Sequence, residues 1–162
     1  MYRQDEKGFT LYELLITVAV AAIILSFGVP GFMDIIQNNR ATTHTNDLVT
    51  ALNLARSEAT RRAATVTVCS STNGATCNGT TDWSTGWVVR TATEVLRVWP
   101  ERSGGDQVVT NTAHTTVAFD PRGALTAGPT TFSIEPAGCT GDRGRMVSVG
   151  AAGSIAVSRT NC

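Results

Sequence analysis

The sequence lacks the short motifs on which most enzyme classes depend. It contains no Gly-x-Ser-x-Gly nucleophile motif, no phosphate-binding glycine loop and no His-Glu-x-x-His metal motif. Its two histidines, His44 and His114, lie in unrelated segments, and we expect both at the surface. The sequence therefore predicts that the protein is not an enzyme, with no catalytic residue, no cofactor, no metal site and no small-molecule substrate.

The chain also lacks an excess of charge of either sign. Its 13 Lys and Arg residues balance 13 Asp and Glu residues, so the composition gives no global indication of a nucleic-acid partner. No low-complexity tract and no repeat of solenoid length is present. A chain of 162 residues is long enough for one helix and one small domain.

One stretch lacks charge altogether. No charged residue occurs between Glu13 and Asp34, where Leu, Ile, Val, Ala and Phe predominate. As a helix, this stretch would be about 30 Å long, which matches the hydrocarbon core of a bilayer. Arg3 and Lys7 precede it, so the leader is expected in the cytoplasm and the remainder outside. A secretory signal peptide is the alternative, but its apolar core is shorter, and no Ala-x-Ala sequence closes this run.

The start of this stretch, Gly8-Phe9-Thr10-Leu11-Tyr12-Glu13-Leu14-Leu15, resembles the processing motif of type IV prepilins. The resemblance implies cleavage after Gly8 by a prepilin peptidase and N-methylation of the new terminal residue, Phe9. It also implies that Glu13 acts in subunit assembly by pairing with the terminal amine of a neighbouring subunit. A carboxylate beside hydrocarbon is costly unless it is neutralised or paired; a solvated Glu13 in the headgroup region is the alternative. Tyr12 departs mildly from the aliphatic residue usual in the motif.

The helix is expected to continue well beyond the apolar run. Pro30 occupies the position of a proline in pilins, and because it lacks an N–H group it predicts a helix kink. From there the helix is expected to reach about Arg62. An apolar stripe at spacings of four, three and four residues predicts one face packed on a sheet: Leu48, Leu52, Ala55 and Ala59. Residues 38–46 are mostly polar and are expected to be solvated or to face another subunit.

The remaining chain predicts short β-strands. About seven are expected, at residues 65–69, 86–90, 95–99, 116–119, 131–134, 145–149 and 154–157. The second and third would form a hairpin, and the turn sequence Asp120-Pro121-Arg122-Gly123 would end the fourth. The expected fold class is α+β, a long N-terminal helix packed on a small antiparallel β domain. Three tryptophans are expected in the core beside the sheet rather than on a binding platform: Trp83, Trp87 and Trp99.

Several segments together resemble the GspH/FimT family of type IV minor pilins and type II secretion minor pseudopilins. They are Ala55-Arg56-Ser57-Glu58-Ala59, Val66-Thr67-Val68-Cys69, Asp82-Trp83 and Gly86-Trp87-Val88-Val89. The resemblance implies a type IV pilin-like fold and a low-copy structural subunit that assembles into, or primes, a pilus or a secretion pseudopilus. The implied partners are other pilins or pseudopilins through the N-terminal helix, the prepilin peptidase and the inner membrane.

This interpretation divides the chain into four segments. Residues 1–8 are the leader peptide and 9–33 the transmembrane half of the helix. Residues 34–62 are its amphipathic half and 63–162 the β-rich periplasmic domain. The expected location is the bacterial inner membrane, with a single pass, followed by the filament.

The four cysteines all lie in the segment expected in the periplasm, where disulfides can form. No Cys-x-x-Cys pair indicates a metal site. Of the three possible pairings, we expect two local disulfides, Cys69–Cys77 and Cys139–Cys162. Each would add about 2–4 kcal/mol to stability. Four free thiols would conflict with this compartment.

A DNA receptor of a transformation pilus is the alternative function, because some FimT-like members have that role. Those relatives carry a Gly-Arg-x-Arg motif near the C-terminus, whereas Gly153-Ser154-Ile155-Ala156 keeps only the glycine and Gly144-Arg145-Met146-Val147 keeps one arginine. The candidates for a weak DNA contact are Arg143, Arg145 and Arg159, and Asp142 would partly cancel their charge. Because non-specific affinity depends on the number of phosphates neutralised, we expect no appreciable duplex binding at physiological ionic strength.

Overall fold

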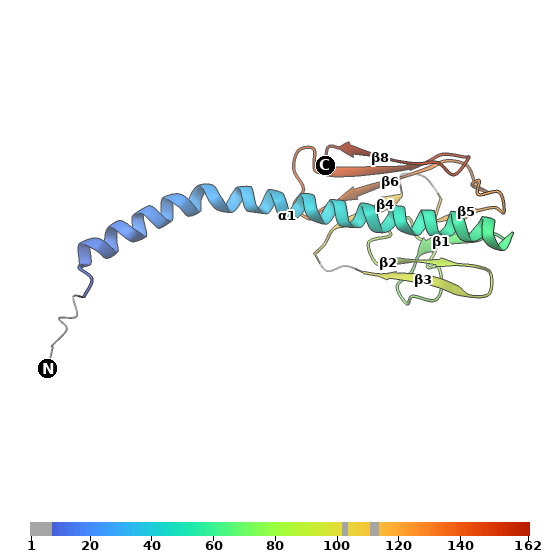
Figure 1. Cartoon of the computed structure of the whole chain (residues 1–162), viewed down its shortest axis with the longest axis horizontal. Helices are drawn as coiled ribbons and strands as arrows, with labels where there is room; N and C mark the ends of the chain where they lie inside the picture. The colour runs from blue at the N-terminus through green and yellow to red at the C-terminus, as the bar shows by residue number, and fades with distance from the viewer. Residues whose placement is uncertain (1–7, 102–103, 111–113) are drawn as a thin grey trace. The chain divides into compact units, whose positions relative to one another are not determined.

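The computed structural model describes residues 8–101, 104–110 and 114–162, with the side chains of 27–31 excepted (Figure 1). Helix α1 spans Leu11–Arg62 and is followed by eight strands in the described residues. These are β1 (Val66–Ser70), β2 (Gly86–Arg90), β3 (Val95–Pro100), β4 (Gln107–Thr110), β5 (Thr116–Phe119), β6 (Thr130–Glu135), β7 (Gly144–Val149) and β8 (Ile155–Thr160). The chain divides into two compact units, Met1–Ile36 and Gln37–Cys162.

The described part of the first unit consists of residues 8–10 and the N-terminal part of α1. Leu, Ala and Ile favour the helix here, and its backbone is helical through Pro30. The kink expected at Pro30 stays a prediction.

The second unit contains two antiparallel four-stranded sheets. One has the order β3-β2-β1-β5 and the other the order β4-β6-β7-β8. The expected hairpin of β2 and β3 is confirmed, with Trp87 opposite Trp99. The turn after β5 is also confirmed, since the Gly123 N–H donates to the carbonyl oxygen of Asp120 at 2.8 Å. All seven predicted strands are present, with ends displaced by at most a few residues.

Strand β4 and the division into two sheets were not predicted. Strand β4 has only two apolar residues, Val108 and Val109, which is too short a pattern to indicate a strand by itself. It forms because β6 pairs with it from Gln107 to Thr110. The expected α+β pilin-like fold therefore holds, but its β domain has two sheets rather than one.

One hydrophobic core joins the last part of α1 to both sheets. The predicted stripe of Leu48, Leu52, Ala55 and Ala59 is completely buried, as are Val66 and Val68 of β1 and Phe132 and Ile134 of β6. The prediction that the tryptophans pack in the core is confirmed, since all three are at most 6% exposed, and Trp83 meets Phe132 edge to face at 4.8 Å. Burial of a Phe, Leu or Ile side chain contributes about 1.5–3 kcal/mol, so this cluster holds the helix on the sheets.

The polar residues between positions 38 and 46 were expected to be solvated or to face another subunit. This expectation is wrong for His44 and Thr45, which are buried, and the surface position expected for His44 is therefore wrong as well. His44 is buried because its Nε2 lies 3.0 Å from the Oδ2 atom of Asp106, so the ring has a polar partner inside the protein. His114 is half-buried rather than fully exposed.

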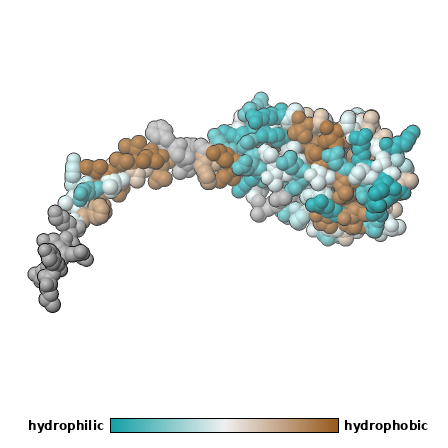
Figure 2. All heavy atoms as spheres, in the orientation of Figure 1, coloured by the Kyte–Doolittle hydropathy of each residue, from teal (hydrophilic) through white to brown (hydrophobic). Residues whose placement is uncertain are grey.

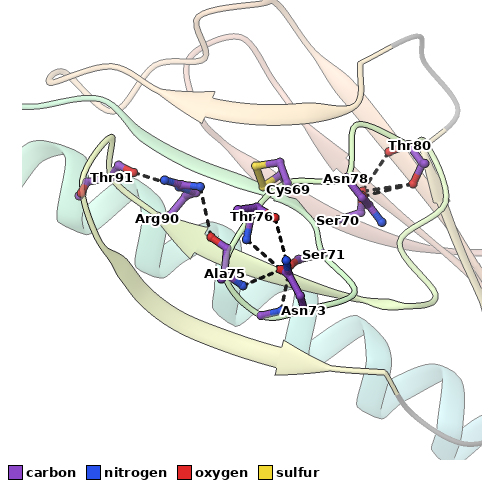
Figure 3. Close-up of a disulfide and its surroundings, with 12 residues drawn as sticks. Cys69, Ser70, Ser71, Asn73, Ala75, Thr76, Asn78, Thr80, Arg90 and Thr91 are labelled. Carbon is purple, nitrogen blue, oxygen red and sulfur yellow. Dashed lines mark hydrogen bonds between the residues drawn. A yellow bond between two sulfur atoms is a disulfide. The ribbon is translucent and has the colours of Figure 1, made fainter.

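Both predicted disulfides are confirmed. Cys69–Cys77 has a Cα separation of 5.5 Å, and Cys139–Cys162 has one of 5.7 Å. Figure 3 shows the loop that the first disulfide closes, with Asn73 at its centre. The Asn73 Oδ1 atom accepts from the Ala75 and Thr76 backbone N–H groups, each at 2.9 Å, so an asparagine turn shapes the loop.

Candidate functional site

The predicted processing site lies just ahead of α1. Gly8, Phe9 and Thr10 precede the first helical residue, Leu11. Phe9 is 86% exposed, and apart from its two chain neighbours nothing lies within 4 Å of a Cβ placed on Gly8. None of the described residues covers either residue of the predicted cleavage site, and residues 1–7 of the leader lie outside the described residues.

Glu13 forms a capping box with Thr10. The Thr10 N–H and hydroxyl each donate to the Glu13 carboxylate at 2.9 Å, and the Glu13 N–H donates back to the Thr10 hydroxyl at 3.3 Å. These bonds satisfy groups that the first turn of a helix leaves without partners. The sequence predicted an assembly role for Glu13, with a solvated side chain as the alternative, and the cap was missed although the Thr-x-x-Glu spacing is its signal. Glu13 thus has a local structural role beside any role in assembly.

The first part of α1 exposes many large apolar side chains. Figure 2 shows that hydrophobic residues predominate along it. The large exposed side chains include Leu11, Leu14, Leu15, Ile16, Val18, Val20, Ile23, Ile24 and Leu25. Within the part of the chain that the structure describes, no helix combines the length and the hydropathy of a membrane span. An apolar surface of this extent indicates a contact surface rather than a solvated helix.

A buried carboxylate connects the second part of α1 to two loops. The Asp106 side chain is 2% exposed and contacts the ring of His44 and, at 3.8 Å, Nη1 of Arg40. Its Oδ1 atom also accepts the Ala137 N–H at 2.8 Å, and nearby the Gln37 amide donates to the Gly138 carbonyl oxygen at 2.9 Å. This cluster positions the helix against both loops and was not predicted. His44 and Asp106 are 62 residues apart, so no local pattern could indicate it.

The three candidate DNA-contact residues do not form one exposed cluster. Arg145 is buried, and its guanidinium donates to the carbonyl oxygens of Arg143 and Gly144 and to the Asn38 side chain. Arg143 is half-buried and donates to Gln37 at 3.3 Å. Arg159 is exposed and lies 3.8 Å from Asp142. One exposed cation with a carboxylate beside it is a weak basis for phosphate binding. The expected lack of duplex binding stays a prediction.

No metal centre is evident among residues 8–101, 104–110 and 114–162. These residues contain no group of three or more His, Cys, Asp and Glu side chains that could hold an ion.

Comparison with known proteins gives matches for both parts of the chain. The sequence profile of the type II transport protein GspH family matches residues 44–153, and that of the prokaryotic N-terminal methylation motif matches residues 3–29. No curated protein sequence matches the chain significantly.

Solved structures with the same fold are minor pilins and pseudopilins. The type IV minor pilin FimU of Pseudomonas aeruginosa, in two crystal forms, is 22% identical, with TM-scores of 0.60 and 0.63. These matches cover 72% and 74% of this chain and 91% and 89% of FimU. The minor pseudopilin EpsH from the type 2 secretion system of Vibrio cholerae is 14% identical, with a TM-score of 0.51. This match covers 74% of this chain and 97% of EpsH.

The expected family and fold are therefore confirmed. Because the GspH profile matches more than half of the chain, this protein, whose residues 3–29 also match the prokaryotic N-terminal methylation motif, belongs to the type II transport protein GspH family.

Proposed function

We propose that this protein is a minor pilin or pseudopilin, a structural subunit that assembles through α1 into a type IV pilus or a type II secretion pseudopilus. One observation carries the proposal: a single chain combines a methylation motif at residues 3–29, exposed apolar residues along the same part of α1, and a GspH domain at residues 44–153. The fold shared with FimU and EpsH supports assembly into a pilus and assembly into a pseudopilus equally. Nothing in this arrangement requires the protein to act as an enzyme.

The proposal assigns a task to each segment. Residues 1–8 are a leader that a prepilin peptidase removes, and residues 9–33 hold the precursor in the inner membrane by a single pass. Residues 34–62 connect this anchor to the β domain, 63–162, in the periplasm. The uncharged run from Leu14 to Met33 supports the anchor. The two disulfides support an oxidising compartment for the domain.

Processing at Gly8 tests the proposal most directly. N-terminal mass analysis of membrane-extracted protein should find N-methylated Phe9 as the first residue. Gly8→Ala should leave most of the protein as an unprocessed precursor, whereas the control Gly28→Ala should be processed normally. A retained Met1, or cleavage near residues 28–31, would contradict the proposal and favour a signal anchor or signal peptide.

The role proposed for Glu13 in assembly can be separated from its role as a helix cap. Glu13→Gln keeps a side chain that can complete the capping box but removes the charge. Thr10→Val removes the two bonds that the Thr10 hydroxyl makes in the cap and keeps the charge of Glu13. If Glu13 pairs with a neighbour's terminal amine, Glu13→Gln should reduce incorporation into filaments more than Thr10→Val does, with membrane insertion unchanged in both. The opposite order would assign Glu13 to the cap alone.

A further inference from the structure

A depression on the second unit is lined by arginines from three separate segments. It has a volume of about 690 Å³, and its floor is the exposed face of α1 between Thr50 and Thr60. The floor is surrounded by Arg56 of α1, Arg97 of β3 and Arg122 of the turn after β5. None of the described residues that line it is acidic. We call this site the basic depression.

Two of these arginines are held in place without a carboxylate partner. The side chain of Arg56 lies beside Gly123 and Gly153, where a Cβ on the glycine would approach it to 3.2 and 3.0 Å, respectively. Its Nη2 donates to a carbonyl oxygen of the turn before β8 at 3.3 Å. The Arg97 guanidinium lies 4.6 Å from the centre of the buried Trp99 ring. Neither guanidinium forms an ion pair with the described residues, so both charges are available to a ligand.

Arg122 and Asn53 complete the polar lining. Arg122 lies 2.9 Å from Asp120, while its own side chain is 87% exposed. Asn53 is exposed on the floor, and its amide makes no hydrogen bond to the part of the chain that the structure describes. The hydroxyl groups of the floor, in contrast, donate to carbonyl oxygens of α1 itself. The donors left for a ligand belong to guanidinium and amide groups, so the ligand has to supply acceptors and negative charge.

The surroundings of the basic depression favour a short acidic protein segment over a nucleic acid. Nucleic-acid binding depends on the number of phosphates that are neutralised together. The next two cations along α1, Arg61 and Arg62, are already paired with carboxylates, and Arg122 lies beside Asp120. A phosphate backbone that continued beyond the depression would therefore gain little there. Guanidinium groups bind carboxylates in a fork geometry, which gives a contact with Asp or Glu side chains a defined orientation.

The position of the basic depression on α1 indicates which protein supplies these carboxylates. A minor subunit is present in few copies, so most of its neighbours in a filament are different proteins. The floor of the depression belongs to α1, the helix that takes part in assembly under the proposed function. A neighbour that packs along the second part of α1 therefore covers the depression and brings its own side chains to the arginines.

We propose that the basic depression docks an acidic segment of a different subunit of the same filament, through two or more Asp or Glu side chains. This inference rests on the proposed function as a filament subunit. Arg56 and Arg97 are the fixed anchors, and Arg122 is the exposed cation at the edge. Exposed ion pairs add little affinity each, so the contact selects the partner and its orientation while the apolar part of α1 supplies most of the association.

The test uses the full-length chain in cells that contain the other proteins of the filament. A photo-crosslinking residue replaces Ser57, which is exposed on the floor of the depression. Ser57→p-benzoylphenylalanine should crosslink to a different subunit, at a segment that mass spectrometry shows to contain Asp or Glu side chains. High salt should weaken the crosslink. In the same chain, Arg97→Glu combined with Arg122→Glu should lower the yield about fivefold or more.

A matched control and a reciprocal change make the test specific. Arg159→Glu reverses an arginine that is also exposed but does not line the depression, and it should change the yield less than about twofold. Replacement of the acidic residues of the crosslinked segment by Arg should restore the yield of the doubly reversed depression. Restoration would show at the same time that the doubly reversed variant is folded.

Several results would overturn the inference. They are an equal loss with Arg159→Glu, a lack of restoration by the reciprocal change, a crosslinked segment without Asp or Glu, or a crosslink only to nucleic acid or to a second copy of this chain. The N-terminus is measured in the same cells. Processing after Gly8 without a crosslink from Ser57 would refute this inference alone, whereas unprocessed protein would refute the proposed function itself.

Discussion

The buried Asp106 should be the most sensitive polar position of the second unit. In Asp106→Ala, the Ala137 N–H loses its acceptor at 2.8 Å and the His44 ring loses its partner at 3.0 Å. The side chain is 2% exposed, so water does not readily replace either bond. Each buried polar group left without a partner costs about 1–3 kcal/mol, and Asp106→Ala leaves two such groups. We therefore expect a loss of about 3–5 kcal/mol in the free energy of unfolding.

The assay is urea and thermal unfolding of a fragment that spans the second unit, residues 37–162. For a domain of this size, the expected loss lowers Tm by about 10–20 °C. Asp106→Asn keeps an oxygen for the Ala137 N–H and should lose about 1–2 kcal/mol. The control, Asp142→Ala, removes an exposed carboxylate that lies 3.8 Å from Arg159 and should cost less than about 0.5 kcal/mol. If Asp106→Ala were no more destabilising than Asp142→Ala, the assignment of Asp106 as a stabilising link would be refuted.

Two further predictions concern a turn and a surface ion pair. Gly153→Ala should lose about 3 kcal/mol, because φ is +78° and the new Cβ would lie 2.1 Å from the Gly123 carbonyl oxygen. Gly79→Ala, at φ +71° with open space around it, should lose only about 1 kcal/mol; equal losses in unfolding experiments would exclude a role for the contact. Hydrogen bonds from Arg61, then Arg62, lower the pKa of Glu58 from 4.5 to about 2. The contribution of ionised Glu58 to the free energy of unfolding should therefore be complete above pH 4.5 and be lost as the pH falls through about 2. An NMR titration of the Glu58 carboxyl group should show a midpoint near pH 2, and Arg61→Ala should raise that midpoint.

The helix and its packing face could be predicted because their patterns are local. Four small or apolar residues at helical spacing identified the buried stripe, and Thr91–Glu94 between two β-branched runs identified the hairpin of β2 and β3. The disulfides were predictable for the same reason, since each joins cysteines close in sequence.

The features that escaped prediction depend on partners distant in sequence. Strand β4 forms because β6 pairs with it, and His44 is buried because its ring contacts the Asp106 carboxylate. Arg56, Arg97 and Arg122 line one depression although they come from three segments, so no single stretch of sequence indicates that they lie together. The capping box is different, because Thr10 and Glu13 are three residues apart and the pattern was available.

The assignment of strands to sheets has a consequence for the order in which the domain folds. Strand β4 belongs to the second sheet, yet it precedes β5, which completes the first. A chain synthesised from its N-terminus therefore presents β4 before its partner β6 exists, and an unpaired strand edge is a site for misassembly. The segment that precedes β2 provides β4 with an earlier partner. The Trp83 N–H donates to the Val108 carbonyl oxygen at 2.7 Å, and Asp82 forms a β-bridge with Val109. Strand β4 can thus be held by residues already made, and the later strands of the second sheet then add to it in the order in which they emerge.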